Sequence, residues 1–427
     1  MTADLQGRAL AFLNRFAQAD WPDRLKLRKP VERLIYRGSR ASFRAAAKRS
    51  AQAGKGPRAV DGDALFDLSL SDEQQMLVEM LQGFALEVLR PLAHEADAHG
   101  ALPASLLNQV HALGLSHYGV GEAQGGLAGE RTTLTNALMA EALARGDLSL
   151  AAALLVPLSA ANCMRRWGSQ AQQAQWLPAF VGEEPAPVMA IAVSEPRPLF
   201  DPHRLATQAK KRGQHYLLSG EKCLVLRGLD ASRLIVAAQA ADGPGLFIVE
   251  AGAKGLQRRP EPAMGLKAAG TARLLLKNVR VPASARLAGA AFDYQGFLDH
   301  ASLAWCALAV GTCQAALDYV IGYCNERMAF GEPISHRQGV AFKVADMAVE
   351  LDAMRLLLWR ACSRAERGLP FQREAYLAQL LCSEKAMQIG TDAVQLLGGH
   401  GFTQEHPVER WYRDLRAVAV MAGGLQL

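Results

Sequence analysis

The spacing of apolar residues changes twice along this chain of 427 residues, and this change constrains the fold more than any other feature. From about Leu65 to Gly182, apolar residues recur at intervals of three and four, as on one face of a helix. From Pro187 to about Leu287, short apolar runs are separated by Gly, Asp and Pro, a pattern typical of strands. Helical spacing returns from about Phe292. The sequence therefore predicts an α+β fold with a β region between two helical regions.

Positive charge is concentrated in the first 60 residues, which hold 14 Lys and Arg against 4 Asp and Glu, whereas the whole chain has a net charge of +6. Apolar side chains lie among these cations, and such a segment could contact an anionic membrane surface or an acidic partner. The alternative is an extension packed on the body with its arginines in water. The segment lacks the apolar core of a secretory signal and the pattern of a nucleic-acid-binding module, so neither role is predicted.

The seven cysteines are scattered, and none shows a CxxC or Cys/His ligand spacing. The sequence therefore predicts buried free thiols in a reducing, cytoplasmic compartment and no metal site. No apolar run reaches the roughly 18 to 20 residues that a membrane-spanning helix needs, so no such helix is predicted.

Residues 323–338, YCNERMAFGEPISHRQ, form the stretch densest in functional residue types. Arg327 offers a planar charged group suited to phosphate. Phe330 precedes a glycine, where the backbone can turn or be approached closely. Taken alone, this stretch favours a corner between two helices, with the arginine in water.

Four further motifs accompany that stretch, and the set resembles the acyl-CoA dehydrogenase family from about Leu65 to Gly424. The motifs are AIAVSEP (190–196), YLLSGEK (216–222), VRVP (279–282) and QLLGGHGFTQEHPVERWYRDLR (395–416). The resemblance implies a three-domain fold: a helical N-terminal domain, a central β-sandwich-like domain and a C-terminal four-helix bundle. The predicted divisions are a basic extension and linker (1–63), the helical domain (64–184), the β domain (185–290) and the C-terminal helical domain (291–427).

The resemblance also implies an acyl-CoA thioester as ligand, FAD as cofactor and an oligomer, either of identical chains or with an active paralogue. Among relatives, FAD is often held across a subunit interface, which is the reason to expect an oligomer. Asp299 matches a residue that touches acyl-CoA. The residues that match cofactor contacts are Ser194, Arg327, Phe330, Gln338, Gln395, Gly398 and Gly399.

The match weakens in the part that would hold the flavin ring. In the loop after Ser194, Arg197 and Leu199 replace two glycines of the family pattern, so bulky side chains stand where the backbone approaches a ligand. In the next motif Leu224 replaces a tryptophan, and Leu226 replaces a threonine that hydrogen-bonds the ring. Leucine cannot supply that polar contact.

The catalytic base is also missing. Desaturation of a thioester transfers an α-proton to a base and a hydride to the flavin, and the family uses a glutamate at one of two positions. These positions match Ala422 and Ala301, and neither side chain can accept a proton. His300 adjoins the second position, but one residue is a rotation of about 100° around a helix. The catalytic residue is therefore unassigned.

Three interpretations remain open from the sequence. The first is an active FAD-dependent acyl-CoA dehydrogenase of fatty acid metabolism with a substitute base. The second is a catalytically impaired partner subunit, a pseudoenzyme. The third is a flavin-free interaction protein that uses the basic extension.

Overall fold

The chain divides into two compact units, residues 1–66 and 67–427. The computed structural model describes residues 69–129, 132–287 and 292–427, all of them in the second unit. The predicted basic extension lies outside the described residues. The predicted domain divisions stay predictions.

The N-terminal part of the second unit is helical. The spacing of Ser71 and Gln74 predicts a capping box, and the structure contains it: Gln74 N–H donates to Ser71 Oγ, and Ser71 N–H donates to Gln74 Oε1. Gly100, with φ at +67°, ends a helix in the left-handed conformation that glycine favours. The α-helices are α4 (Asp72–Phe84), α5 (Arg90–His99), α6 (Ala104–Ala112), α7 (Thr132–Ala144), α8 (Leu148–Leu154), α9 (Val156–Trp167) and α10 (Gln170–Trp176), with a π-helical turn (Ala85–Leu89) between α4 and α5.

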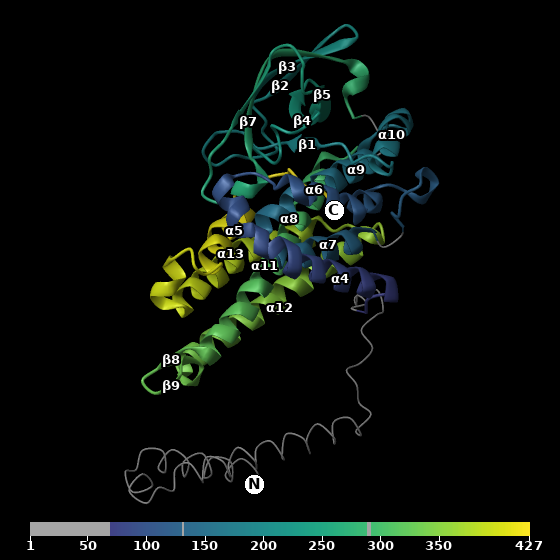
Figure 1. The fold of residues 1–427 in the computed structure, drawn as a ribbon. Coiled ribbons are helices and arrows are strands. Elements are labelled where there is room, and N and C mark those ends of the chain that lie inside the picture. The colour runs from purple at the N-terminus through teal and green to yellow at the C-terminus, as the bar shows by residue number, and fades with distance from the viewer. Residues whose placement is uncertain (1–68, 130–131, 288–291) are drawn as a thin grey trace, which may run out of the picture. The chain divides into compact units, whose positions relative to one another are not determined.

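The central part is one seven-stranded sheet that curls on itself (Figure 1). Its strands are β1 (Met189–Ala192), β2 (Gln208–Arg212), β3 (His215–Val225), β4 (Arg233–Ala240), β5 (Gly243–Glu250), β6 (Leu256–Pro260) and β7 (Ala272–Pro282). The strand order is β1-β4-β2-β3-β7-β6, with β5 paired to β4. β4 pairs in parallel with β1 and β2, and the other pairs are antiparallel.

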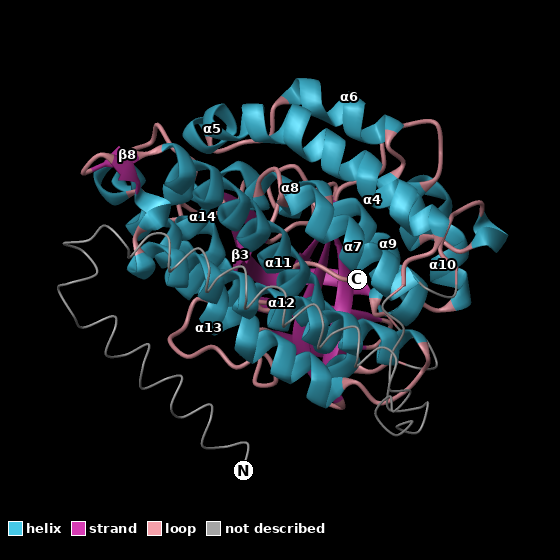
Figure 2. Ribbon diagram, turned by 90° about the horizontal axis from the view of Figure 1, so that it is seen from below, coloured by secondary structure: helices cyan, strands magenta, loops and turns pink. Residues whose placement is uncertain are grey.

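The C-terminal part is built from long helices. They are α11 (Tyr294–Glu326), α12 (Gln338–Glu366), α13 (Gln372–Leu396) and the short α14 (Val408–Leu415), with a hairpin of β8 (Met328–Ala329) and β9 (Glu332–Pro333) between α11 and α12. Helices α12 and α13 pack on each other and on α11 (Figure 2). The predicted succession of helical, β and helical domains is confirmed.

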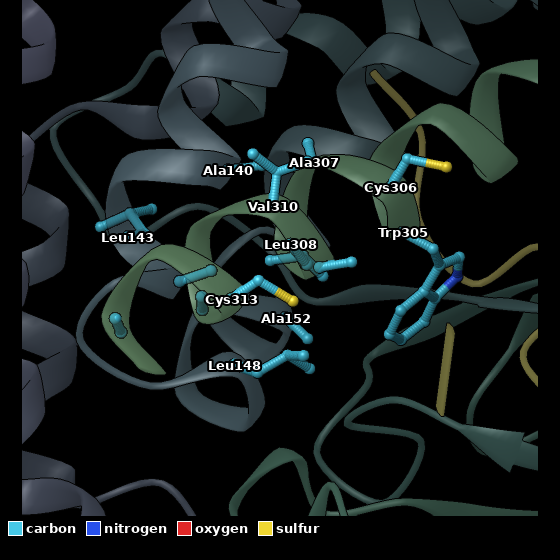
Figure 3. Close-up of a cluster of buried hydrophobic side chains, with 14 of the residues drawn as sticks. Ala140, Leu143, Leu148, Ala152, Trp305, Cys306, Ala307, Leu308, Val310 and Cys313 are labelled. Carbon is cyan, nitrogen blue, oxygen red and sulfur yellow. The ribbon is translucent and has the colours of Figure 1, made fainter. Parts of the chain in front are cut away.

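Helix α11 is the centre of the helical core. Its side chains Leu308, Val310 and Cys313 lie among residues of α7 and α8, such as Leu143 and Leu148 (Figure 3). By length and composition this helix could cross a membrane, which the sequence analysis did not predict. However, 78% of its most apolar stretch is buried inside the protein, as in the core helix of a soluble fold. All seven cysteines are buried free thiols, as predicted.

Candidate functional site

A cavity of about 460 Å³ lies where the β domain meets the C-terminal helices. Four of its residues come from one face of α11, because they are spaced by three, four and seven residues along the helix. The lining comprises Pro202, His203, Gln295, Leu298, Asp299, Ser302, Gln372, Arg373, Tyr376, Gln379, Ala422 and Gly423.

The cavity has a polar, exposed mouth and a buried floor. His203, Arg373 and Tyr376 are exposed at the mouth, whereas Leu298 and Gly423 are buried at the floor. A ligand with a charged end and an apolar end would therefore place its charge near Arg373 and its apolar end against the floor.

Asp299 is the one carboxylate in this lining, and it is buried. Gln295 Nε2 donates to Asp299 Oδ1 over 2.8 Å. Burial raises the pKa of the Asp299 carboxyl, and the hydrogen bond from Gln295 opposes that rise only in part. The resemblance predicted a ligand contact for Asp299, and its place in the cavity is compatible with that role.

Ala422 lies at the floor, and its backbone is fixed by a predicted site residue. Ser194 Oγ donates to Ala422 O over 3.2 Å, and Ala422 N–H donates to Ser194 Oγ over 3.4 Å. On the next residue, Gly423 O accepts from Trp305 Nε1 over 2.8 Å. The position expected for the base therefore borders the cavity, but it presents only a methyl group.

The other candidates for a base do not line the cavity. Ala301 is 1% exposed and belongs to the core. His300 is buried against the rings of Trp167 and Phe371, and its Nδ1 has no hydrogen-bond partner among the described residues. Burial holds the pKa of His300 well below its usual value, so the imidazole is neutral. Because its ring packs in the core and does not line the cavity, the structure gives no support to His300 as a substitute base.

A second, smaller cavity of about 120 Å³ lies beside the same segment and is mostly apolar. Its lining includes Leu224, Leu266, Val420 and Met421. Leu224 has φ at +52° at an irregularity of β3, a conformation that a bulky side chain rarely adopts, and its N–H donates to Glu261 Oε2 over 2.6 Å. The hydrogen bond to Glu261 therefore helps to hold Leu224 in this strained backbone conformation.

A buried ion pair fixes the loop that carries Ser194 to strand β3. Lys222 is 0% exposed, and its Nζ donates to Val193 O over 2.9 Å and to Glu195 Oε1 over 3.0 Å. Burial lowers the pKa of Lys222 to about 8, although the charge of Glu195 opposes this effect. The pair joins two of the motifs that carry the family resemblance.

The remaining predicted cofactor residues gather at another place, the end of the C-terminal helices where α11 and α13 end and α12 begins. Lys343 Nζ pairs with Asp392 Oδ1 over 2.6 Å and ties α12 to α13 there. The hairpin that holds Phe330 lies at the end of α12 far from the β sheet (Figure 1). Arg327, Phe330, Gln338, Gln395, Gly398 and Gly399 are all exposed.

The two glycines leave their backbone open to a ligand. Gly398 has φ at +58°, which favours glycine, and a Cβ added to Gly398 or Gly399 would meet no atom of the described protein within 4 Å. Packing within this chain therefore does not require glycine at Gly399. An open backbone next to an exposed Arg327 suits the close approach of an anionic group.

Comparison with known proteins finds one family that matches all three parts of the second unit. The N-terminal, middle and C-terminal domains of acyl-CoA dehydrogenase match residues 71–184, 190–279 and 292–426. A probable acyl-CoA dehydrogenase of Bacillus subtilis is 33% identical over 84% of this chain and 96% of the relative. The chain belongs to the acyl-CoA dehydrogenase family.

Solved structures of this family superpose on the chain. Butyryl-CoA dehydrogenase from Megasphaera elsdenii has a TM-score of 0.75 and 30% identity, and the match covers 84% of this chain and 96% of the other. The FAD complex of PigA has a TM-score of 0.76 and 27% identity, with the same coverage.

A flavin fits one end of this acyl-CoA dehydrogenase-family chain better than the other. The exposed end with Arg327 and the open glycines suits a pyrophosphate. The small cavity beside Leu224 suits an isoalloxazine ring less well, because its volume is about 120 Å³ and its lining is mostly apolar, with Thr271, Arg413 and Arg416 as the polar side chains. Ser194, which the resemblance assigned to the cofactor, exchanges two hydrogen bonds with the backbone of Ala422, and its contact with the cofactor stays a prediction.

Sequence reasoning missed the residues at the cavity mouth. His203 follows β1 in a loop, and Gln372, Arg373 and Tyr376 begin α13. No family motif marks these positions, and only packing of the β domain against α13 brings them together.

Proposed function

We propose that this chain is a thioester-binding subunit of an acyl-CoA dehydrogenase assembly and that it does not desaturate its ligand alone. The observation that carries the proposal is the floor of the cavity, where Ala422 presents a methyl group at the position expected for the base. An α-proton can leave only to a group that accepts it, and neither Ala422 nor Ala301 has one. The chain therefore binds its ligand without the usual proton acceptor.

The chain is an acyl-CoA dehydrogenase-like flavoprotein, an oxidoreductase by family, and FAD is its cofactor. When bound, FAD would supply a hydride acceptor for oxidation at the β-carbon of a thioester. Arg327 and the open backbone of Gly398 and Gly399 support a contact with the pyrophosphate. Because the small cavity beside Leu224 is mostly apolar and suits the ring less well, we propose that these residues complete a flavin site on a second subunit, an active paralogue.

The chemistry of the cavity supports an acyl-CoA as the ligand. The mouth offers the cation Arg373 and the imidazole of His203 to phosphate groups. Gln295 and Gln379 can hydrogen-bond the amides of a pantetheine arm. Leu298 and Ala422 give the thioester end an apolar surface. The lining therefore contains groups suited to the phosphate, amide and thioester parts of an acyl-CoA molecule.

The test is a pair of measurements on the purified chain after dialysis against excess FAD. Calorimetry should detect binding of butyryl-CoA, and the flavin absorbance should not bleach when that thioester is added. Co-expression with a paralogue that retains the glutamate should give an assembly in which butyryl-CoA bleaches the flavin and enoyl-CoA is formed. Bleaching by this chain alone, or purification only as an assembly of identical chains, would contradict the proposal.

Asp299 favours a second candidate function, an active dehydrogenase. It is the carboxylate of the cavity, and burial raises its pKa, as suits a general base. In this alternative the α-proton passes to the Asp299 carboxylate. Exchange of the α-hydrogens of butyryl-CoA with deuterium in D2O measures that step without oxidation. Exchange that Asp299→Asn abolishes and Ser302→Ala retains would establish this alternative, and absence of exchange would dismiss it.

Two further proposals concern the cellular compartment of the protein and the contacts of its basic extension. We place the protein in the cytoplasm, because its seven buried thiols suit a reducing compartment. The basic extension lies outside the described residues, and its charge supports contact with an anionic membrane or acidic partner. Sedimentation with phosphatidylserine vesicles tests the membrane contact. A chain that binds neither FAD nor CoA but sediments would be an interaction protein.

A further inference from the structure

The residues that follow Ala422 are buried deep in the second unit. Leu425 is 1% exposed, Gln426 is 2% exposed and Leu427 is 2% exposed. In a segment without helix or strand, such burial requires that side chains of other elements satisfy the backbone polar groups.

Three hydrogen bonds join this segment to two helices, α9 and α11. From α9, Asn162 Nδ2 donates to Gln426 O over 3.2 Å. In return, Gln426 Nε2 donates to Phe297 O of α11 over 2.9 Å. Further along α11, Trp305 Nε1 donates to Gly423 O. Figure 3 shows the indole of Trp305 projecting away from the helix. The segment is therefore anchored from α9 and from two turns of α11.

The segment is also pressed against the β domain. A Cβ at Gly423 would lie 2.3 Å from Val193 Cγ2, so only glycine fits there, and its φ of +68° also favours glycine. Leu425 and Leu427 pack in the same core cluster as Leu226 and Trp305. The residues that directly follow Gly423, the last lining residue of the cavity, are therefore packed into the core.

We propose that residues 423–427 form a plug that closes the inner end of the cavity and limits a bound thioester to a short acyl group. The inference rests on the proposed function, because it assumes that the cavity takes a thioester. A ligand held at the mouth by Arg373 and His203 directs its acyl end to the floor at Ala422 and Gly423. A longer acyl chain would have to displace the plug, break its hydrogen bonds and expose Leu425 and Leu427.

The test is calorimetry of CoA, acetyl-CoA, butyryl-CoA, hexanoyl-CoA and octanoyl-CoA binding to the full chain. In an open apolar pocket each buried methylene strengthens binding about fourfold, so octanoyl-CoA would bind about 200-fold more tightly than butyryl-CoA. We expect instead that the affinity stops rising, or falls, after butyryl-CoA. An affinity that rises by that factor up to octanoyl-CoA would overturn the plug.

A variant that opens the plug gives the reciprocal test. Leu425→Ala combined with Leu427→Ala should make octanoyl-CoA bind at least tenfold more tightly relative to butyryl-CoA. The matched control is Leu356→Ala, since Leu356 is 47% exposed on α12 and outside the cavity lining. An unchanged ratio in the folded double variant would contradict the proposal. The series on the unaltered chain decides the question even if the variant does not fold.

The outcomes separate this inference from the function on which it rests. If neither CoA nor any thioester binds, the proposed function is wrong. If all bind and the affinity follows the open-pocket trend, only the plug is wrong.

Discussion

The buried pair of Lys222 and Glu195 gives the sharpest test of how the site is built. We consider Lys222→Met, which keeps an unbranched side chain as far as Cε and removes the ammonium group. In the folded protein, Lys222 Nζ donates to Val193 O and to Glu195 Oε1, and the lysine is 0% exposed. The variant therefore removes the buried counter-charge of Glu195, leaves the carboxylate only the partly exposed Arg197 at 3.8 Å, and leaves one carbonyl without its donor.

The loss in the free energy of unfolding depends on the hydrogen bonds that Glu195 keeps in the variant. Removal of one partner of a buried pair costs about 3 to 5 kcal/mol. Glu195 keeps the N–H groups of Ala206 and Thr207, at 2.7 and 2.9 Å, so we take the lower end, about 3 kcal/mol. The lost bond to Val193 O adds about 1 kcal/mol. With about 2 cal/mol/K of unfolding entropy per residue, a loss of about 4 kcal/mol lowers the melting temperature of the second unit by about 5 °C.

Thermal unfolding measured by circular dichroism at pH 7 checks this value. The matched control is Lys210→Met, because Lys210 is exposed on β2 and its removal should change the melting temperature by less than about 1 °C. Glu195→Gln in the Lys222→Met background should restore part of the loss, since no buried charge remains. A single variant as stable as the parent, or a double variant less stable than the single one, would refute the reasoning.

The same pair predicts a dependence on pH. The folded pKa of Lys222, about 8, lies below its usual value of 10.5, so the unfolded chain binds more protons between these two values. The free energy of unfolding contributed by this lysine should therefore increase as the pH rises from 8 toward 10.5. Lys222→Met should abolish this contribution. A difference between parent and variant that stays constant over this range would contradict the assignment.

Three further predictions concern the other parts of the site and its frame. Gly399→Ala should leave the melting temperature unchanged, because the added Cβ meets no protein atom. The same variant should weaken FAD binding to the assembled protein severalfold, as measured by absorbance titration. Gly398→Ala should lower the free energy of unfolding by about 1 kcal/mol, because the positive φ of Gly398 favours glycine. Arg410→Met should cost at least about 3 kcal/mol in chemical denaturation, since Asp147 is buried at 2.9 Å from Arg410 Nε and would lose its partner. Trp305→Phe should cost about 1 kcal/mol and speed amide hydrogen exchange in the residues after Ala422; unchanged exchange there would show that the indole does not anchor the segment.

The sequence alone determined the features that depend on neighbouring residues. The change of apolar spacing near 185 and 290 identified the helical and β parts, because the periods of a helix and a strand differ locally. The capping box at Ser71 was evident for the same reason. The alanine at position 422 was also decisive, since a methyl group cannot accept a proton in any fold.

The tertiary structure decided which residues share a cavity. His203, Asp299 and Arg373 come from a loop, the start of α11 and the start of α13, and no local pattern relates them. The helix rotation that turns Asp299 to the cavity turns Ala301 and His300 to the core, which a linear alignment does not express. The cofactor residues stay predictions, and the separation of the other six from Ser194 depends on the lengths of α11 and α13. Burial of residues 423–427 likewise follows from α9, α11 and β1 meeting around them, because contacts between distant segments are set by packing and not by the residues beside them in the chain.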